Sequence, residues 1–220
     1  MKEIFSQGVV EKTAYLNWRT DRHDHIQNML VIADGFRDSA LLLVKELLND
    51  NTFNRADNII FPVLFNANHS IEVYLKAICW TQNLLLGNDD TFPKDHNLKG
   101  LFNKVVELEN KFGHPSDKTR FMDMLSKLES YIDELYGNIE RTVKGKNGND
   151  RIIHDITFCR YALSNDLEPQ FYINTFDNVM VDLENFLNVF KEIFDNLSSL
   201  AMHYQAQLEA KQEAQFECRE

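Results

Sequence analysis

The sequence predicts an all-α fold, a single up-and-down bundle of four to five helices with a long C-terminal helix. Apolar residues recur at three- and four-residue steps along most of the chain, which is the spacing of amphipathic helices. A composition with 44% hydrophobic residues, four prolines and eight glycines is typical of a globular protein rather than a disordered one. A length of 220 residues suits one well-buried core, and no internal repeat or linker divides the chain.

The first two helices follow from their apolar periodicity. A helix from about Asp24 to Leu48 is predicted by an apolar face made of Ile26, Met29, Leu30, Ala33, Phe36, Ala40, Leu43, Val44 and Leu47. The polar segment 49–58 breaks this helix. A second helix follows, with Pro62 in its first turn, where proline is tolerated, and it ends before 86–90. Because this helix is apolar on most of its circumference, we expect it to lie at the centre of the bundle.

The next two helices are delimited by capping residues. A third helix is predicted from about Asn97 to Phe112, closed by Gly113 in the position of a left-handed C-cap. Ser116 can cap a fourth helix that extends to about Arg141.

The remaining third of the chain changes character. The segment 141–151 is rich in glycine and asparagine and is predicted as a loop, and 157–163 is β-prone and could be extended. A long final helix is predicted from about Phe171 to Leu208. We expect one domain over 1–220, with its core at about 22–208 and a polar tail at 209–220 that frays. The final helix has more apolar residues than one stripe needs, which favours a homodimer; the surplus is Phe171, Phe176, Phe186, Phe190 and Phe194.

Charge and cysteine content limit the class of protein. The net charge of −11 argues against an open, non-specific nucleic-acid-binding surface, so any polyanion would have to meet a local basic patch. The N-terminus has no apolar region of signal-peptide type, and the apolar runs are too short to span a membrane. Three widely separated cysteines are typical of reduced thiols. We therefore expect a soluble, cytoplasmic protein that does not enter a membrane.

Neither a metal ion nor a cofactor is expected from the sequence. His23 and His25 are only two residues apart and would diverge on a helix, so they do not predict a shared metal site. The glycines of 141–151 do not form a Walker pattern.

A line of charge-capable residues crosses the apolar segment 61–80. On a helix His69, Glu72 and Lys76 share one face. One interpretation is a Glu72–Lys76 ion pair in the favourable i, i+4 order, with His69 hydrogen-bonded nearby. The other is that buried charges need partners from elsewhere in the fold, and Asp95-His96-Asn97 and Arg160-Tyr161 can supply them. We expect one polar cluster inside the bundle, formed by His69, Glu72, Lys76, His96, Asn97, Arg160 and Tyr161.

The order of these motifs resembles the HEPN superfamily, the helical domains named for higher-eukaryote and prokaryote nucleotide-binding proteins. The resemblance covers roughly residues 60–200 and rests on three motifs: His69-x-x-Glu72-x-x-Leu75-Lys76-Ala77, His96-Asn97-Leu98 and Arg160-Tyr161. It implies a four- to five-helix bundle that often dimerises. It also implies a place in a bacterial toxin–antitoxin or antiviral defence system, where many members are ribonucleases that act at the dimer interface.

The nuclease members of that superfamily carry an arginine, four to six residues and a histidine near the end of the bundle. The arginine stabilises charge on phosphate, and the histidine serves as acid or base. This chain has no such pair in that place. Arg19 and His25 have the spacing at the opposite end of the chain, and Arg151 and His154 are too close together. The sequence therefore favours a binding protein over an enzyme, with a metal-independent endoribonuclease as the alternative.

A basic segment offers a second binding region. Arg141, Lys144, Lys146 and Arg151 face a single acid, Asp150, in the predicted loop. This loop can bind phosphate through its basic side chains and backbone amides, or it can be solvated surface without a ligand. RNA, a nucleotide or a partner protein such as an antitoxin are the expected ligands. A purely structural interaction bundle remains the third interpretation.

Overall fold

The computed structural model describes residues 3–112, 115–144, 149–154, 156–164 and 167–217. Within them it confirms an all-α bundle with a long C-terminal helix. The long helices are α1 (His25–Asn49), α2 (Ala56–Leu86), α3 (Leu98–Glu109), α4 (Pro115–Ile139) and α6 (Leu183–Glu217). Short elements complete the fold: η1 (Val10–Lys12), η2 (Thr52–Asn54), β1 (Glu140–Lys144), β2 (Asp150–His154), η3 (Ile156–Cys159) and α5 (Phe171–Asn174).

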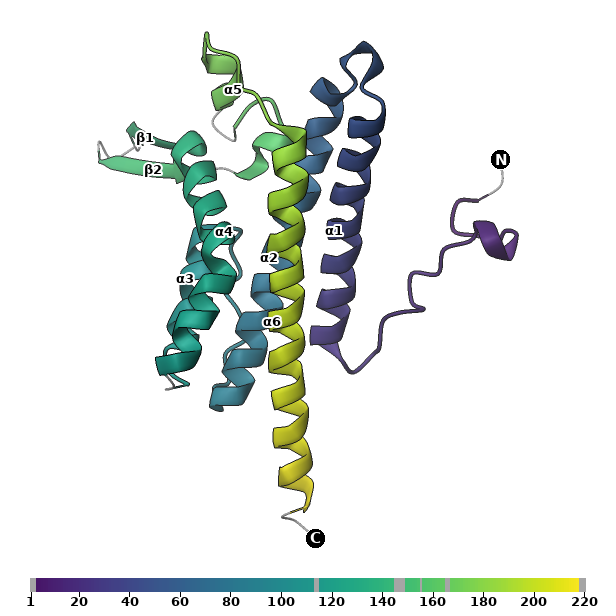
Figure 1. The fold of residues 1–220 in the computed structure, drawn as a ribbon, viewed down its shortest axis with the longest axis vertical. Helices are drawn as coiled ribbons and strands as arrows, with labels where there is room; N and C mark the ends of the chain where they lie inside the picture. Colours follow the sequence, from purple (N-terminus) through teal and green to yellow (C-terminus); the bar gives the residue numbers. More distant parts are fainter. Residues whose placement is uncertain (1–2, 113–114, 145–148, 155, 165–166, 218–220) are drawn as a thin grey trace.

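Helix α2 lies at the centre of this bundle, as its apolar circumference predicts. It packs against α1, α3, α6 and η3, and Figure 1 shows α6 in front of it with α1 on one side and α3 and α4 on the other. Ile71, Leu75 and Ile78 are completely buried, and the Ser70 hydroxyl donates to the Ala33 carbonyl of α1 at 2.8 Å. In the described part of the chain, no helix has the length and apolar character needed to cross a membrane.

Helix boundaries follow the capping residues where these are present. The Asp24 carboxylate accepts a hydrogen bond from the Gln27 amide at 2.8 Å, so α1 begins at His25. The Asn97 side chain caps α3 in the same way through the Gly100 amide at 2.9 Å. Gly87 ends α2 with φ of 74°, the left-handed conformation that favours glycine. Gly113, the predicted cap after α3, lies outside the described residues.

Helix α2 begins earlier than predicted, at Ala56. Pro62 therefore lies inside the helix rather than in its first turn, where it leaves one backbone carbonyl without its helical partner.

The prediction of a loop at 141–151 is wrong at both ends of this segment, where Glu140–Lys144 and Asp150–His154 form an antiparallel β-hairpin. Arg141 pairs with Ile153 and Thr142 with Ile152. The β-branched residues on both sides of the glycine-rich centre favour strands, and their effect exceeds the loop signal of the composition. The predicted extended segment is also partly wrong, because Ile156–Cys159 forms the 3₁₀ helix η3. Phe158 and Cys159 are buried there, and the Arg160 amide donates to the Thr157 carbonyl at 2.8 Å.

The final helix starts later and ends later than predicted. Only Phe171–Asn174 is helical at the predicted start, and α6 begins at Leu183, where the Asp182 carboxylate accepts from the Asn185 amide at 3.0 Å. Helix α6 continues to Glu217, so the predicted frayed tail is helical over 209–217. The Lys211 ammonium group donates to the Leu84 and Leu85 carbonyls at 3.1 and 3.0 Å and fastens α6 to the end of α2.

The aromatic surplus of the final segment is divided between core and surface. Phe186, Phe190 and Phe194 are buried within the bundle, with Phe186 and Phe190 stacked at 3.9 Å between ring centroids. Phe171 is partly buried, whereas Phe176 is fully exposed in the extended segment before α6. Most of these rings therefore stabilise the monomer and are unavailable to a dimer interface.

Two cysteines lie in the interior, Cys79 on α2 and Cys159 on η3. The Cys159 sulfur of η3 lies 4.0 Å from the Asn68 amide nitrogen, and Asn68 also accepts a hydrogen bond from the Tyr131 hydroxyl at 2.5 Å. The Cys79 thiol points to the Thr91 carbonyl, 3.7 Å away, under the connection that leads to α3. Both thiols are free, and burial raises the pKa of Cys79 to about 11 and that of Cys159 to about 12.

Truncation of Leu75 tests the central position of α2. The side chain is completely buried, so Leu75→Ala is expected to lower the free energy of unfolding by about 2–5 kcal/mol. Met202→Ala on α6 is the control, because Met202 is 66% exposed and its loss is expected to cost no more than about 0.5 kcal/mol. Chemical denaturation followed by far-UV circular dichroism measures both values. Equal effects of the two substitutions would contradict this packing.

Candidate functional site

The polar residues predicted on α2 meet at one buried carboxylate. Glu72 is 5% exposed in its side chain and accepts from the Lys76 ammonium group at 2.7 Å. His96, from the connection before α3, brings its Nδ1 within 2.8 Å of the same oxygen, Oε1. His69 Nδ1 lies 3.8 Å from the other oxygen, Oε2. We call His69, Glu72, Lys76 and His96 the Glu72 centre.

Aromatic rings lie against Lys76 and His69 of the Glu72 centre, whereas the His96 side chain is 72% exposed. The Lys76 ammonium group lies 5.6 Å from the centroid of the Phe92 ring, and the His69 ring stacks on Phe65 at 5.7 Å. Phe36 from α1 meets His69 edge-on at 4.5 Å. The carboxylate itself is only 5% exposed, and this burial strengthens its interaction with Lys76.

Arg160, Tyr161 and Asn97 do not join the Glu72 centre through any described contact. The Arg160 guanidinium lies over the rings of Phe65 and Tyr161, at 5.4 and 5.5 Å. Asn97 caps α3 and accepts from the Tyr136 hydroxyl at 2.8 Å. Four of the seven residues predicted for one polar cluster therefore meet at Glu72. Among the described contacts, the Phe65 ring is what links Arg160 to His69.

The electrostatics of Glu72 reflect two opposing effects. Burial raises its pKa, but the nearby His69 ring, the hydrogen bonds with Lys76 and His96 and the charge of Lys76 outweigh that effect and lower the pKa to about 2. The carboxylate is therefore ionised and its charge is matched inside the protein. This arrangement can hold α2 against the start of α3, and it leaves little capacity for an added ligand.

Four of the other residues predicted for binding or catalysis, Arg141, Lys144, Arg151 and His154, lie on the β1–β2 hairpin. The Arg141 guanidinium donates to the Pro169 carbonyl at 3.4 Å, which ties the hairpin to the segment before α5. Lys144, Arg151 and His154 lie on the two strands by their backbone, and Arg151 pairs with Val143. Lys146 lies outside the described residues, as do the side chains of Lys144, Arg151 and His154. Nothing in the described geometry brings these groups to a common centre.

Arg19 and His25 are also apart. Arg19 is exposed in the chain before α1, whereas the His25 ring, at the first residue of α1, stacks on Trp80 at 6.2 Å between centroids. Among the described contacts, none joins Arg19 to His25, so their sequence spacing does not build a catalytic pair in this chain.

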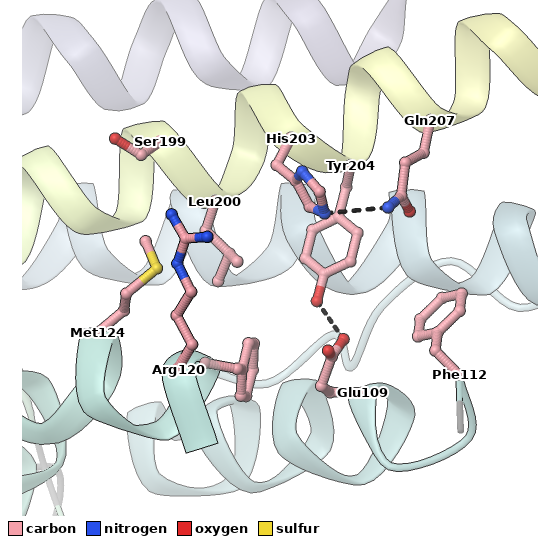
Figure 2. Close-up of a pocket in the computed structure, with 10 residues that line it drawn as sticks. Glu109, Phe112, Arg120, Met124, Ser199, Leu200, His203, Tyr204 and Gln207 are labelled. Atoms are coloured by element: carbon pink, nitrogen blue, oxygen red, sulfur yellow. Dashed lines mark hydrogen bonds between the residues drawn. The ribbon is translucent and has the colours of Figure 1, made fainter. Parts of the chain in front are cut away.

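An open pocket lies elsewhere, where three helices meet (Figure 2). It has a volume of about 580 Å³ and lies between the end of α3, the start of α4 and the middle of α6. We call it the α3–α4–α6 pocket. Its lining residues are Glu109, Phe112, Arg120, Phe121, Met124, Ser199, Leu200, His203, Tyr204 and Gln207.

The polar groups of this pocket come from all three helices. Figure 2 shows the Arg120 guanidinium extending from α4 toward α6, with His203 on the facing wall. His203 Nε2 lies 2.9 Å from the Gln207 amide nitrogen. Arg120 makes no hydrogen bond or ion pair with another described side chain, so its guanidinium can bind a ligand.

A network of hydrogen bonds holds Glu109, the acidic residue of the pocket, in place. The Tyr204 hydroxyl donates to the Glu109 carboxylate and accepts from the Gln82 amide of α2 at 3.0 Å. Burial, the hydrogen bond to Glu109 and the Glu109 charge raise the pKa of Tyr204, so the hydroxyl stays protonated. Glu109 is therefore held in one orientation at the floor of the pocket, as Figure 2 shows.

No local sequence signal identifies this pocket. Glu109 is the last residue of α3, Arg120 lies near the start of α4, and His203 lies in the middle of α6. Tertiary packing, and not sequence spacing, therefore brings them together. Among the described residues, no group of three or more histidine, cysteine, aspartate or glutamate side chains comes together as a metal site would require. No protein-family model, curated protein or solved structure matches the chain.

Neutralising Glu72 tests the electrostatic account of the Glu72 centre. The unfolded chain titrates at about pH 4.3 and the folded carboxylate at about pH 2, so ionised Glu72 stabilises the fold above about pH 4.3. This contribution is lost as the pH falls toward 2. Glu72→Gln is expected to cost about 3 kcal/mol at pH 7, and the difference from the native chain is expected to shrink toward pH 3. Denaturant titrations at both pH values measure it.

The exposed Glu46 of α1 provides the control for this comparison. Glu46→Gln is expected to change the free energy of unfolding by less than about 0.5 kcal/mol at either pH. A Glu72→Gln penalty that stays the same at both pH values would show that shape, and not charge, is what the centre requires.

Proposed function

We propose that this protein is a HEPN-like binding module of a bacterial defence or toxin–antitoxin system, and that it binds a nucleotide or the end of an RNA. The proposed site is the α3–α4–α6 pocket. The observation that carries the proposal is that Arg120 and His203 face one cavity of about 580 Å³ from different helices. The order of the His69, His96 and Arg160 motifs and the helical bundle support the HEPN-like assignment.

The lining of the pocket suits the parts of a nucleotide. An arginine guanidinium binds phosphate oxygens in pairs, and a histidine and an amide beside it can add hydrogen bonds. The Phe112 ring, whose centroid lies 6.0 Å from that of Tyr204, offers a surface on which a base can stack. The fixed Glu109 carboxylate can accept hydrogen bonds from the amino group of a base. The volume is in the range of small-ligand sites.

Charge limits the size of this ligand. The chain has a net charge of −11, and Glu109 places a negative charge inside the pocket. A long RNA backbone would be repelled by most of the surface, whereas one phosphate can be held by Arg120. The proposed ligand is therefore a nucleoside monophosphate or a single terminal nucleotide of an RNA.

A second function, a divergent endoribonuclease that needs no metal, is favoured by the same two residues. Arg120 can stabilise charge on a phosphate in the transition state, and His203 can transfer a proton. Here the two groups come from separate helices, and not from the closely spaced pair that the nuclease members carry. Binding and cleavage can be distinguished by experiment.

Loss of the Arg120 guanidinium tests the proposed binding site. A hydrogen bond to a charged group contributes about 1.5–3 kcal/mol, so Arg120→Ala is expected to weaken binding of AMP, GMP or a 5′-phosphorylated RNA oligonucleotide by about 10- to 100-fold. Lys118→Ala is the matched control, because Lys118 is an exposed cation on the same helix that does not line the pocket. Isothermal titration calorimetry measures the affinities. Equal losses in both variants would mean that only general charge matters.

Incubation with labelled RNA separates the two functions. The proposed binding module is expected to leave the RNA intact while it retards its migration in a native gel. Cleavage that persists in the presence of a metal chelator and disappears in His203→Ala would instead establish the ribonuclease. Lys118→Ala is expected to behave like the native chain in either case.

A further inference from the structure

The acid and the arginine of the α3–α4–α6 pocket lie apart. Figure 2 shows Glu109 and Phe112, near the end of α3, on one side of the pocket and the Arg120 guanidinium of α4 toward the other. Among the described contacts, the Glu109 carboxylate accepts one hydrogen bond, from Tyr204, and forms no ion pair. A ligand that spans the pocket therefore meets a cation at one end and a hydrogen-bond acceptor at the other.

Buried groups set the orientation of the Glu109 carboxylate. Tyr204 and Gln82 are 3 and 0% exposed, and the Gln82 amide donates both to the Tyr204 oxygen at 3.0 Å and to the Val105 carbonyl at 3.3 Å. Because the Tyr204 oxygen already accepts from Gln82, its hydrogen is directed to Oε2 of Glu109. A carboxylate has about four acceptor positions, so Oε1 and the second lone pair of Oε2 are left for a ligand.

Phe112 supplies an aromatic ring close to this carboxylate. The Phe112 amide donates to the Glu109 carbonyl at 3.0 Å, and its half-buried ring lies 6.0 Å from that of Tyr204 between centroids. One backbone hydrogen bond therefore ties the residue on which a base can stack to the residue that can bind the edge of that base.

A carboxylate distinguishes the bases by the donors on their Watson–Crick edges, because it accepts hydrogen bonds and cannot donate them. Guanine presents two neighbouring donors, a ring N–H and an exocyclic amino group. Adenine and cytosine each present an amino group beside an unprotonated ring nitrogen, whose lone pair repels a carboxylate oxygen. The ring N–H of uracil lies between two carbonyl oxygens. Among the four bases of RNA, only guanine can therefore donate to both oxygens of Glu109 through this edge.

The two ends of the pocket also determine which way a nucleotide lies. A phosphate beside Glu109 would be repelled by its carboxylate, whereas Arg120 attracts it. The phosphate therefore lies at Arg120 and the base at Phe112 and Glu109. In this direction the base edge meets the carboxylate, and hydrogen bonds to an ionised acceptor are about twice as strong as those between neutral groups.

We propose that the α3–α4–α6 pocket selects guanine through two hydrogen bonds from the base to the Glu109 carboxylate, and that Tyr204 is a positioning residue that holds this carboxylate for the base. The inference rests on the nucleotide-binding function proposed above and names the base of its ligand. The ligand is therefore guanosine monophosphate, either free or at the end of an RNA.

Isothermal titration calorimetry of the full chain with three nucleotides tests the selection of guanine. One hydrogen bond to a charged group changes an affinity by about 10- to 100-fold, so GMP is expected to bind about tenfold or more tightly than AMP. Inosine monophosphate keeps the ring N–H of guanine and lacks its amino group. Its affinity is therefore expected to lie between those of GMP and AMP.

Substitution of Glu109 and of Tyr204 tests the role of each. A glutamine amide has a donor beside its acceptor and matches the edge of adenine, so Glu109→Gln is expected to weaken GMP about tenfold or more and not to weaken AMP. Tyr204→Phe releases the carboxylate and is expected to lower the ratio of GMP to AMP affinity, which a general loss of stability does not change. Glu107→Gln is the control and is expected to alter neither affinity, because Glu107 is an exposed acid on α3 that pairs with Lys104 and Lys111 outside the pocket.

RNA oligonucleotides with a 5′-phosphorylated guanosine or adenosine at the end identify the source of the ligand. The guanosine-ended RNA is expected to bind more tightly than the adenosine-ended RNA. If it also binds more tightly than GMP, the ligand is an RNA end, and if it binds more weakly, the ligand is the free nucleotide. Circular dichroism of each variant verifies that the bundle remains folded.

The results separate this inference from the proposed function. Equal affinities for GMP and AMP that both fall in Arg120→Ala would overturn the selection of guanine and leave nucleotide binding in place. Binding of neither nucleotide and neither RNA would overturn both. An equal loss of GMP and AMP affinity in Tyr204→Phe would overturn the positioning role of Tyr204.

Discussion

The buried carboxylate of Glu72 constrains the whole bundle. Helix α2 is surrounded by other helices, so a charged side chain buried on it must find its partners within the fold. Lys76 supplies one from the next turn of α2, and His96 supplies another from the connection to α3. The connection therefore has to cross α2 at this level, and Phe92 covers Lys76 as it does so. The hydrogen bond between Glu72 and His96 therefore helps to hold the start of α3 against α2.

Packed side chains fill the interior of the bundle, and the open pockets lie at its margins. One lies where α3, α4 and α6 meet, and another lies between the α1–α2 connection and the segment before α6. Different side chains line these two surfaces. Occupation of one of these surfaces therefore leaves the other open.

The features that depend on local residue spacing, such as the helices, could be predicted from the sequence. The features that depend on contacts between distant segments could not. Helix α1 and the end of α2 were predicted from apolar periodicity and from the polar segments that interrupt it, and the structure has caps at Asp24 and Gly87 in these places. The late start of α6 was missed because Phe171 and Phe176 continue the helical spacing, whereas the break is set by the Asp182 cap. Helical spacing predicted the Glu72–Lys76 pair with His69 nearby, whereas the need for a partner from elsewhere in the fold indicated both His96, which joins the centre, and Arg160, which does not. The pocket at Arg120 has no such signature, since its walls are far apart in the chain.

The burial of Cys79 and Cys159 determines when their thiols can react. Only the thiolate reacts readily with alkylating agents or oxidants, and burial keeps both sulfurs protonated in the folded chain. Cys159 becomes reactive only when η3 separates from α2, and Cys79 only when the connection at Thr91 lifts away. The rates at which the two sulfurs are modified therefore report two separate local openings, one of η3 and one of the connection at Thr91.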